Sequence, residues 1–330
     1  MDAKITKQRI SRMLSYDWLK IIGLALAVIF FWSLIFTMTS TRMLPSQEFT
    51  IFNYYCNAPI SDAYYTRQDG LVKNNVFSQE VMEVHTYDLA LQPDMYQTLL
   101  QTRFSTNEGD LFFVPNETNQ DVYVMEGEEK KYPLTHVETV LSGYPFQFFD
   151  IEEYLDGMST WLDGWYEGGH QSGTLNEDKI KEDFIAHVTQ NKDKRYKTKK
   201  EKETGANKEV ERVLKYKNAY DVVTGAIADG TVKLERVQTK NSDGTPMVDN
   251  KTGKPVCDGA YALNLCPNDP TAKMQSWYQY NSSTDKDKPT ISAKNMCVMF
   301  LDMYAVADAY EYESLVYVAY MINDCYSTNA

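Results

Sequence analysis

The residue types that catalysis most often uses are scattered along this chain. The sequence contains no G-x-S-x-G, H-E-x-x-H, P-loop or G-x-G-x-x-G pattern. Two carboxylate pairs, Glu152 with Glu153 and Glu311 with Glu313, could form a general acid/base couple, but both lie on predicted helix surfaces, where we expect them to be solvated. We therefore predict that the protein is not an enzyme and holds no cofactor or metal ion. The four histidines stand apart, without a partner motif: His85, His136, His170 and His187.

Aromatic and amide side chains near the ends of predicted strands are the better candidates for binding. At the carboxyl ends of parallel strands such side chains can stack on a ligand or form hydrogen bonds to it. The alternative is that the aromatic rings cover the interface between two lobes. The candidate ligand-binding residues are Tyr54, Tyr55, Asn57, Asn116, Trp277 and Tyr278.

An uncharged segment near the N-terminus predicts a transmembrane helix. It runs for eighteen residues from Ile21 to Met38, which as a helix cover about 27 Å, close to the thickness of a bilayer core. The preceding residues carry five Lys/Arg and two Asp, so the positive-inside rule places the N-terminus in the cytoplasm. A cleaved signal peptide is the alternative, but its apolar region is usually about 7–15 residues long and ends in small residues, whereas this segment exits through T-M-T-S-T-R-M-L-P-S.

These features predict four parts: a cytoplasmic segment 1–20, a transmembrane helix 21–40, a linker 41–48 and an extracytoplasmic domain 49–330. Residues 39–330 hold 28 Lys/Arg and 44 Asp/Glu, a formal charge of −16. This excess of acid argues against a nucleic-acid or anionic-lipid partner, because both need a net basic face. The expected partners are the lipid bilayer, through the segment from Ile21 to Met38, and either a small solute or another membrane protein.

The order of elements in the outer part predicts an α/β domain. Strands are expected at 49–55, 80–89, 111–114, 261–265 and 295–301, and helices at 92–104, 146–165, 176–188, 208–223 and 310–323. The run strand, strand, helix, strand indicates a mainly parallel sheet in three layers. Residues 232–256 carry two turn signals and predict a β-hairpin with a long tip.

A helical, charged region is expected at about 174–228. Within it, residues 191–202 read N-K-D-K-R-Y-K-T-K-K-E-K, with seven basic and two acidic side chains. Such a run could contact phosphate or lipid headgroups, but a solvated surface is the more common role of charge runs, and the acidic surroundings favour that interpretation.

The five cysteines are too few and too dispersed for a disulfide framework: Cys56, Cys257, Cys266, Cys297 and Cys325. We favour buried thiols, with a single bridge such as Cys257–Cys266 as the alternative.

Several segments resemble the extracellular solute-binding proteins of ABC transporters. The resemblance is carried by F-T-I-F-N-Y-Y, E-V-M-E-V-H-T-Y-D-L, T-N-E-G-D-L-F-F-V-P-N, F-F-D-I-E-E-Y-L-D-G and the final Y-E-Y-E-S-L-V-Y-V-A-Y-M-I-N-D. The segments N-K-D-K-R-Y-K-T-K-K-E-K, E-V-E-R-V-L-K-Y-K-N-A-Y and G-A-Y-A-L-N-L-C-P are similar to those of reduced, membrane-anchored relatives in Firmicutes. The resemblance implies a periplasmic-binding-protein-like fold of type II, with two unequal lobes, and a membrane-anchored receptor for a solute. The alternative is an accessory interaction subunit of a membrane or cell-surface complex that has lost solute binding.

Overall fold

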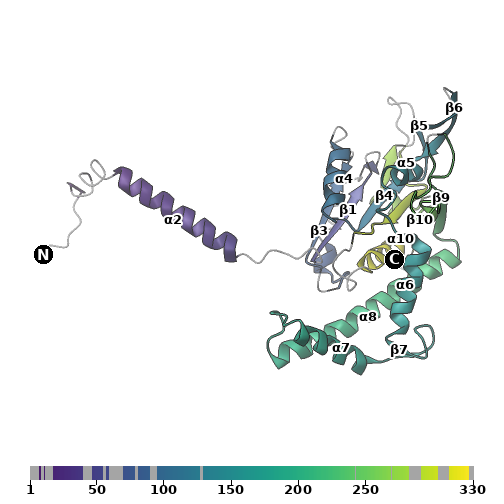
Figure 1. The fold of residues 1–330 in the computed structure, drawn as a ribbon. Coiled ribbons are helices and arrows are strands. Elements are labelled where there is room, and N and C mark those ends of the chain that lie inside the picture. The colour runs from purple at the N-terminus through teal and green to yellow at the C-terminus, as the bar shows by residue number, and fades with distance from the viewer. Residues whose placement is uncertain are drawn as a thin grey trace. The chain divides into compact units, whose positions relative to one another are not determined.

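The computed structural model describes residues 7–8, 11, 18–39, 47–54, 57–58, 70–78, 81–89, 95–126, 129–241, 243–268, 270–281, 291–303 and 312–326. The chain divides into two compact units, Met1–Leu44 and Pro45–Ala330. Each unit has its own kind of structure, an apolar helix in the first and an α/β fold in the second (Figure 1).

The first unit contains the apolar helix α2, Trp18–Thr39. Its 22 residues span about 33 Å, and its large apolar side chains are exposed, Trp32 to 72%. Residues Trp18–Thr37 are long and apolar enough to cross a membrane, a test that a signal sequence also passes. The predicted segment from Ile21 to Met38 therefore forms one helix, of the kind that can insert into a bilayer.

The second unit is built on a mixed six-stranded sheet with the order β3-β1-β4-β13-β10-β9. The pairings of β1 with β3 and β4 are parallel, and the remaining three are antiparallel. The expectation of a mainly parallel sheet is therefore wrong, because β9 and β10 form a hairpin and β13 runs antiparallel to both of its neighbours, β4 and β10. The strands are β1 Glu48–Asn53, β3 Glu83–Asp88, β4 Leu111–Pro115, β9 Lys233–Gln238, β10 Asp258–Asn264 and β13 Met296–Phe300.

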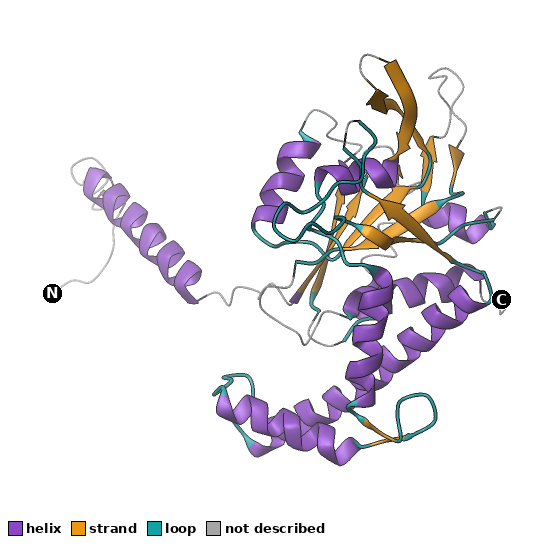
Figure 2. Cartoon of the chain, turned by 45° about the vertical axis from the view of Figure 1, so that its right-hand side comes forward, coloured by secondary structure: helices purple, strands orange, loops and turns teal. Residues whose placement is uncertain are grey.

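Both faces of the central strands are buried, which explains why β4 is apolar throughout. Alternate side chains point to opposite faces, so Ile51 and Phe113 belong to one apolar cluster and Phe52 and Phe112 to the other. The first cluster includes side chains from α6, Ile151–Asp163, α8, Lys199–Ala228, and α10, Glu313–Tyr326. The second includes side chains from α4, Tyr96–Ser105, and α5, His136–Gly143. The unit thus has a helix–sheet–helix arrangement (Figures 1 and 2).

A helical arm projects from this unit. It consists of α7, Glu177–Gln190, packed against the N-terminal half of α8 (Figures 1 and 2). Helix α8 has 30 residues and begins nine residues before the predicted start at Lys208. The charged first turns lack an apolar stripe, but a capping box formed by Thr198 and Glu201 stabilises the helix there.

Short elements complete the unit. Helix α9 is Ala272–Trp277, and the small sheet β12-β11-β2 joins Ile291–Ser292, Gln279–Asn281 and Asn57–Ala58. Two hairpins pair β5, Thr118–Glu126, with β6, Glu129–Thr135, and β7, Tyr166–Glu167, with β8, Thr174–Leu175.

Four cysteines are described as buried free thiols: Cys257, Cys266, Cys297 and Cys325. The bridge between Cys257 and Cys266 is thus not formed, and Cys56 lies outside the described residues.

Candidate functional site

The carboxyl ends of β1, β4 and β10 meet at one edge of the sheet, which we call the carboxyl edge. Strand β13 begins at this edge, because Met296 lies opposite Pro115 and Cys297 lies opposite Asn264. The segments that follow β4 and precede β13 are therefore neighbours. Ligands of open α/β sheets bind beyond the carboxyl ends of parallel strands, so the side chains at this edge are the first candidates for a binding site.

Amide and carboxylate side chains form a connected network at the carboxyl edge. Asn264 Nδ2 donates to Asn295 Oδ1 at 3.2 Å and to Glu235 Oε1 at 2.9 Å. Asn295 Nδ2 donates to Glu117 Oε1 at 2.8 Å, and the Asn116 N–H donates to the Asn295 carbonyl at 2.8 Å. Asn295 has φ 56°, a left-handed conformation that asparagine tolerates better than most residues. Four elements distant in sequence thus hold the network in place.

Asn116, one of the predicted binding residues, contributes a buried acceptor to this edge. Its carboxamide oxygen Oδ1 is buried and makes no hydrogen bond within the structure described. An unsatisfied buried acceptor typically costs about 1–3 kcal/mol, and such groups are uncommon in folded proteins. A ligand with an N–H or O–H donor would satisfy this oxygen.

The predicted aromatic residues lie at the same edge, but their rings are packed inside the protein. Tyr278 is 0% exposed and stacks on Phe113 with ring centroids 4.3 Å apart. Trp277 is also 0% exposed, and its Nε1 donates to Asp324 Oδ2 at 2.7 Å. Tyr54 is buried beside His136, with ring centroids 5.3 Å apart. These rings stabilise the apolar core, and their predicted role in stacking on a ligand stays a prediction.

The other two predicted residues are described less fully. Asn57 lies in β2, paired with Tyr280 of β11, so its backbone adjoins the segment that follows Trp277 and Tyr278. Its side chain and the whole of Tyr55 lie outside the described part of the chain.

A second polar cluster, which the sequence did not reveal, is buried near the start of β4. Asp110 Oδ2 accepts the Thr50 N–H at 2.6 Å, and Glu313 accepts the Ser78 N–H at 3.1 Å and the Tyr216 hydroxyl at 3.0 Å. Glu313 is 1% exposed, so the expectation that it is solvated is wrong. The sequence signal that could have found it is its position beside the apolar stripe of α10.

Burial changes the titration of both carboxyl groups. Loss of hydration raises the pKa of Asp110 to about 8, against the hydrogen bond from Thr50, which lowers it. Burial also raises the pKa of Glu313, whereas Ser78, Arg212 and Tyr216 lower it. Because the carboxyl groups of Asp110 and Glu313 are both buried, we interpret the cluster as a structural part of the core.

The histidines do not gather into a site. His170 is buried and its Nδ1 lies 2.6 Å from Asp163 Oδ1. His85 lies in the edge strand β3, and its Nε2 is 3.9 Å from a carboxylate oxygen of Glu48 and of Glu83. Among the described residues, no group of three or more His, Cys, Asp or Glu side chains could hold a metal ion.

Two surface hollows lie away from the carboxyl edge. One, of about 310 Å³, is on α4 and is lined by side chains such as Met95, Leu99 and Arg103. The other, of about 270 Å³, is lined by side chains such as Phe77, Met82 and Lys208 of α8. Both are open to solvent, and neither includes a predicted binding residue.

Comparison with protein-family models, with curated proteins and with solved structures finds no match to this chain.

Proposed function

We propose that this protein is a single-pass membrane protein with a cytoplasmic N-terminus, and that its α/β unit is a binding module outside the membrane. The apolar helix α2 and its basic N-terminal flank support the anchorage. We further propose that the unit is a reduced relative of the type II solute-binding fold, on the strength of the resemblance described above.

The carboxyl edge is the proposed binding surface for a small polar solute. The observation that carries this proposal is the buried, unsatisfied Oδ1 of Asn116. It lies beside the amide network of Asn264 and Asn295, which is fixed by hydrogen bonds to Glu235 and Glu117. A rigid set of amide groups with one unsatisfied acceptor suits a ligand that donates a hydrogen bond, such as a sugar, a peptide or a polyamine.

Thermal unfolding of the full chain in lipid nanodiscs tests this proposal. A bound solute at about 100 times its Kd should stabilise the unit by about 2.7 kcal/mol, a shift of roughly 5 °C or more. The Asn116→Ala variant should lose the shift, whereas Asn218→Ala, on an exposed part of α8, should retain it. If no sugar, peptide or polyamine raises the Tm, solute binding at this edge is contradicted.

A second candidate function is an accessory interaction subunit of a membrane or cell-surface complex. The observation that favours it is the burial of Trp277 and Tyr278, whose rings are occupied by core contacts. Cross-linking of the full chain in native membranes, followed by identification of the linked chains, tests this function. Recovery of the monomer alone would contradict it.

A further inference from the structure

The end of the helical arm concentrates positive charge on an acidic protein. We call residues 191–202, which join α7 to the first turn of α8, the basic tip. Six of its seven basic side chains are exposed. The tip itself holds two carboxylates, Asp193 and Glu201, and Lys199 also lies 3.8 Å from Glu203 in the next turn of α8. The basic side chains are Lys192, Lys194, Arg195, Lys197, Lys199, Lys200 and Lys202.

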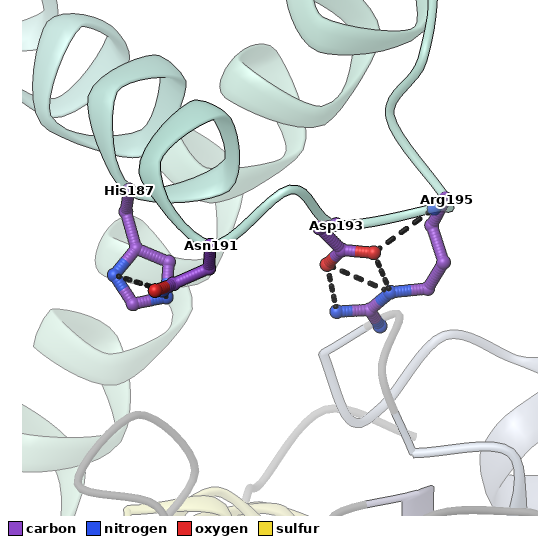
Figure 3. A network of polar contacts seen from close by, with 4 residues as sticks. All are labelled: His187, Asn191, Asp193 and Arg195. Atoms are coloured by element: carbon purple, nitrogen blue, oxygen red, sulfur yellow. Dashed lines mark hydrogen bonds and ion pairs between the residues drawn. The ribbon is translucent and has the colours of Figure 1, made fainter.

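The basic tip has a defined shape. The Tyr196 ring meets Phe184 of α7 edge to face, with centroids 5.1 Å apart, and a Cβ built on Gly205 of α8 would lie 2.5 Å from Tyr196 Cε1. The glycine therefore lets the tyrosine ring lie directly on the helix. The Arg195 guanidinium bonds Asp193 (Figure 3) and lies 5.5 Å from the centre of the Tyr196 ring. These contacts hold the loop so that its lysines extend into solvent.

Two of these lysines lie where the electrostatic potential of the helix disfavours a positive charge. Lys199 and Lys200 occupy the first turn of α8, where the helix dipole is positive and cations are unfavourable by about 0.3–1 kcal/mol each. Glu201 is engaged in the capping box with Thr198. Residues that destabilise the folded state are expected mainly at functional sites, so these two lysines are candidates for a binding role.

The chain enters the α/β unit close to the arm. The Met82 N–H donates to the Gln47 carbonyl at 2.7 Å, and Met82 lines a surface hollow together with Lys208 of α8. Lys199 precedes Lys208 by nine residues, about 14 Å along the helix. Only residues 40–46 separate α2 from Gln47, a reach of at most about 25 Å. The basic tip is thus tethered within a few nanometres of any bilayer that holds α2.

We propose that the basic tip docks on the anionic phosphate headgroups of the bilayer in which α2 is anchored. The proposal rests on the membrane anchorage proposed above and not on solute binding. Each basic side chain near an anionic surface contributes about 1 kcal/mol. Seven basic and two acidic side chains give the tip a formal charge of +5, and the tether makes docking intramolecular, so that even a weak contact forms in a large share of the molecules. The acidic surface of a second copy of this chain is the competing occupant, and the test separates the two.

Chemical labelling of lysines in the full chain tests the docking. The chain is placed in nanodiscs of neutral phosphatidylcholine or of phosphatidylcholine mixed with phosphatidylglycerol, and acylation of each lysine is followed by mass spectrometry. We expect Lys192 and Lys199 to react about fivefold more slowly in anionic discs. Lys251 and Lys254, at the distant turn between β9 and β10, should react equally in both. Salt at about 1 M, which shortens the Debye length to about 3 Å, should abolish the difference.

Matched triple variants identify the residues responsible. Lys194→Gln, Lys197→Gln and Lys200→Gln together should remove the protection of Lys192 and Lys199 while leaving the Tm unchanged or higher, because Lys200 opposes the α8 dipole. The control, Lys73→Gln with Lys251→Gln and Lys254→Gln, removes the same charge elsewhere and should keep the protection.

Three results would overturn the docking: equal labelling in both lipids, protection that survives the triple tip variant, or protection that the control variant also loses. Protection in neutral discs as well would indicate that an acidic face of a second copy of this chain covers the tip, and it would contradict lipid docking. A chain that leaves the discs altogether would overturn the anchorage, whereas a chain that stays in the discs with an unprotected tip would overturn the docking alone.

Discussion

Asp110 illustrates how a single buried side chain makes stability depend on pH. In an unfolded chain its carboxyl group ionises near pH 4, whereas burial in the folded protein raises its pKa to about 8. Between these values the folded state binds more protons than the unfolded state, so the free energy of unfolding falls as the pH rises. The stabilisation is complete below about pH 4 and is lost as the pH approaches 8.

The Asp110→Asn variant should therefore stabilise the protein at about pH 8 and change it little at about pH 4. Asparagine cannot ionise, and its carboxamide oxygen can still accept the Thr50 N–H that Asp110 accepts at 2.6 Å. We expect a rise in Tm of about 4 °C or more at the higher pH, equivalent to about 2 kcal/mol. Thermal unfolding at the two pH values measures it. Asp258→Asn, at the exposed start of β10, is the control, and an equal shift at both pH values for Asp110→Asn would contradict the explanation.

At the scale of elements, helix α8 contains two glycines with opposite roles. Gly205 lies under Tyr196 and Phe184, and a Cβ there would be 2.5 Å and 2.7 Å from their ring atoms. Gly225 has no neighbouring atom within 4 Å of the same position. Helix propensity alone favours alanine over glycine by about 1 kcal/mol at both sites, so packing decides the difference.

We expect Gly205→Ala to destabilise the protein by about 1–3 kcal/mol, because the rings of Tyr196 and Phe184 must move. Gly225→Ala should instead stabilise it by about 0.5–1 kcal/mol. Urea unfolding of both variants measures the free energies of unfolding. Hydrogen exchange at residues 191–198 should increase in the first variant only. If both alanines stabilise the protein, the contact of Tyr196 with α8 is not maintained in solution.

For the molecule as a whole, the proposed membrane anchorage depends on α2. Val28 lies in the middle of this helix and is 60% exposed. An arginine at a helix centre costs about 3 kcal/mol more than valine on insertion scales. We therefore expect Val28→Arg to lower the membrane-inserted fraction by about tenfold or more, measured by alkaline extraction of membranes. Val28→Leu is the control and should remain inserted.

The same preparation separates an anchor from a signal sequence. An uncleaved anchor leaves the chain at its full 38.0 kDa, whereas cleavage beyond α2 would remove the first unit. The intact mass of the membrane-extracted protein distinguishes the two. A mass that lacks residues 1–39 would contradict permanent anchorage.

Part of the candidate site was predictable from the sequence. Asn116, a predicted binding residue that follows the all-apolar strand β4, does lie at the carboxyl edge. The residues that surround it were missed. Asn264 and Asn295 are 31 positions apart and Asn295 and Glu117 are 178 positions apart, and no local pattern links residues at such separations.

Features that depend only on residues close in the chain follow from the sequence alone. The uncharged run of α2, the apolar strand β4 and the periodic apolar faces of α6 and α10 all form where their composition predicts them. Tertiary structure alone decided the direction of β13, the burial of Glu313 and the core positions of Trp277 and Tyr278. The reason is physical: strand direction and burial depend on which distant segments pack together, and each such contact is formed only when the whole unit closes its core.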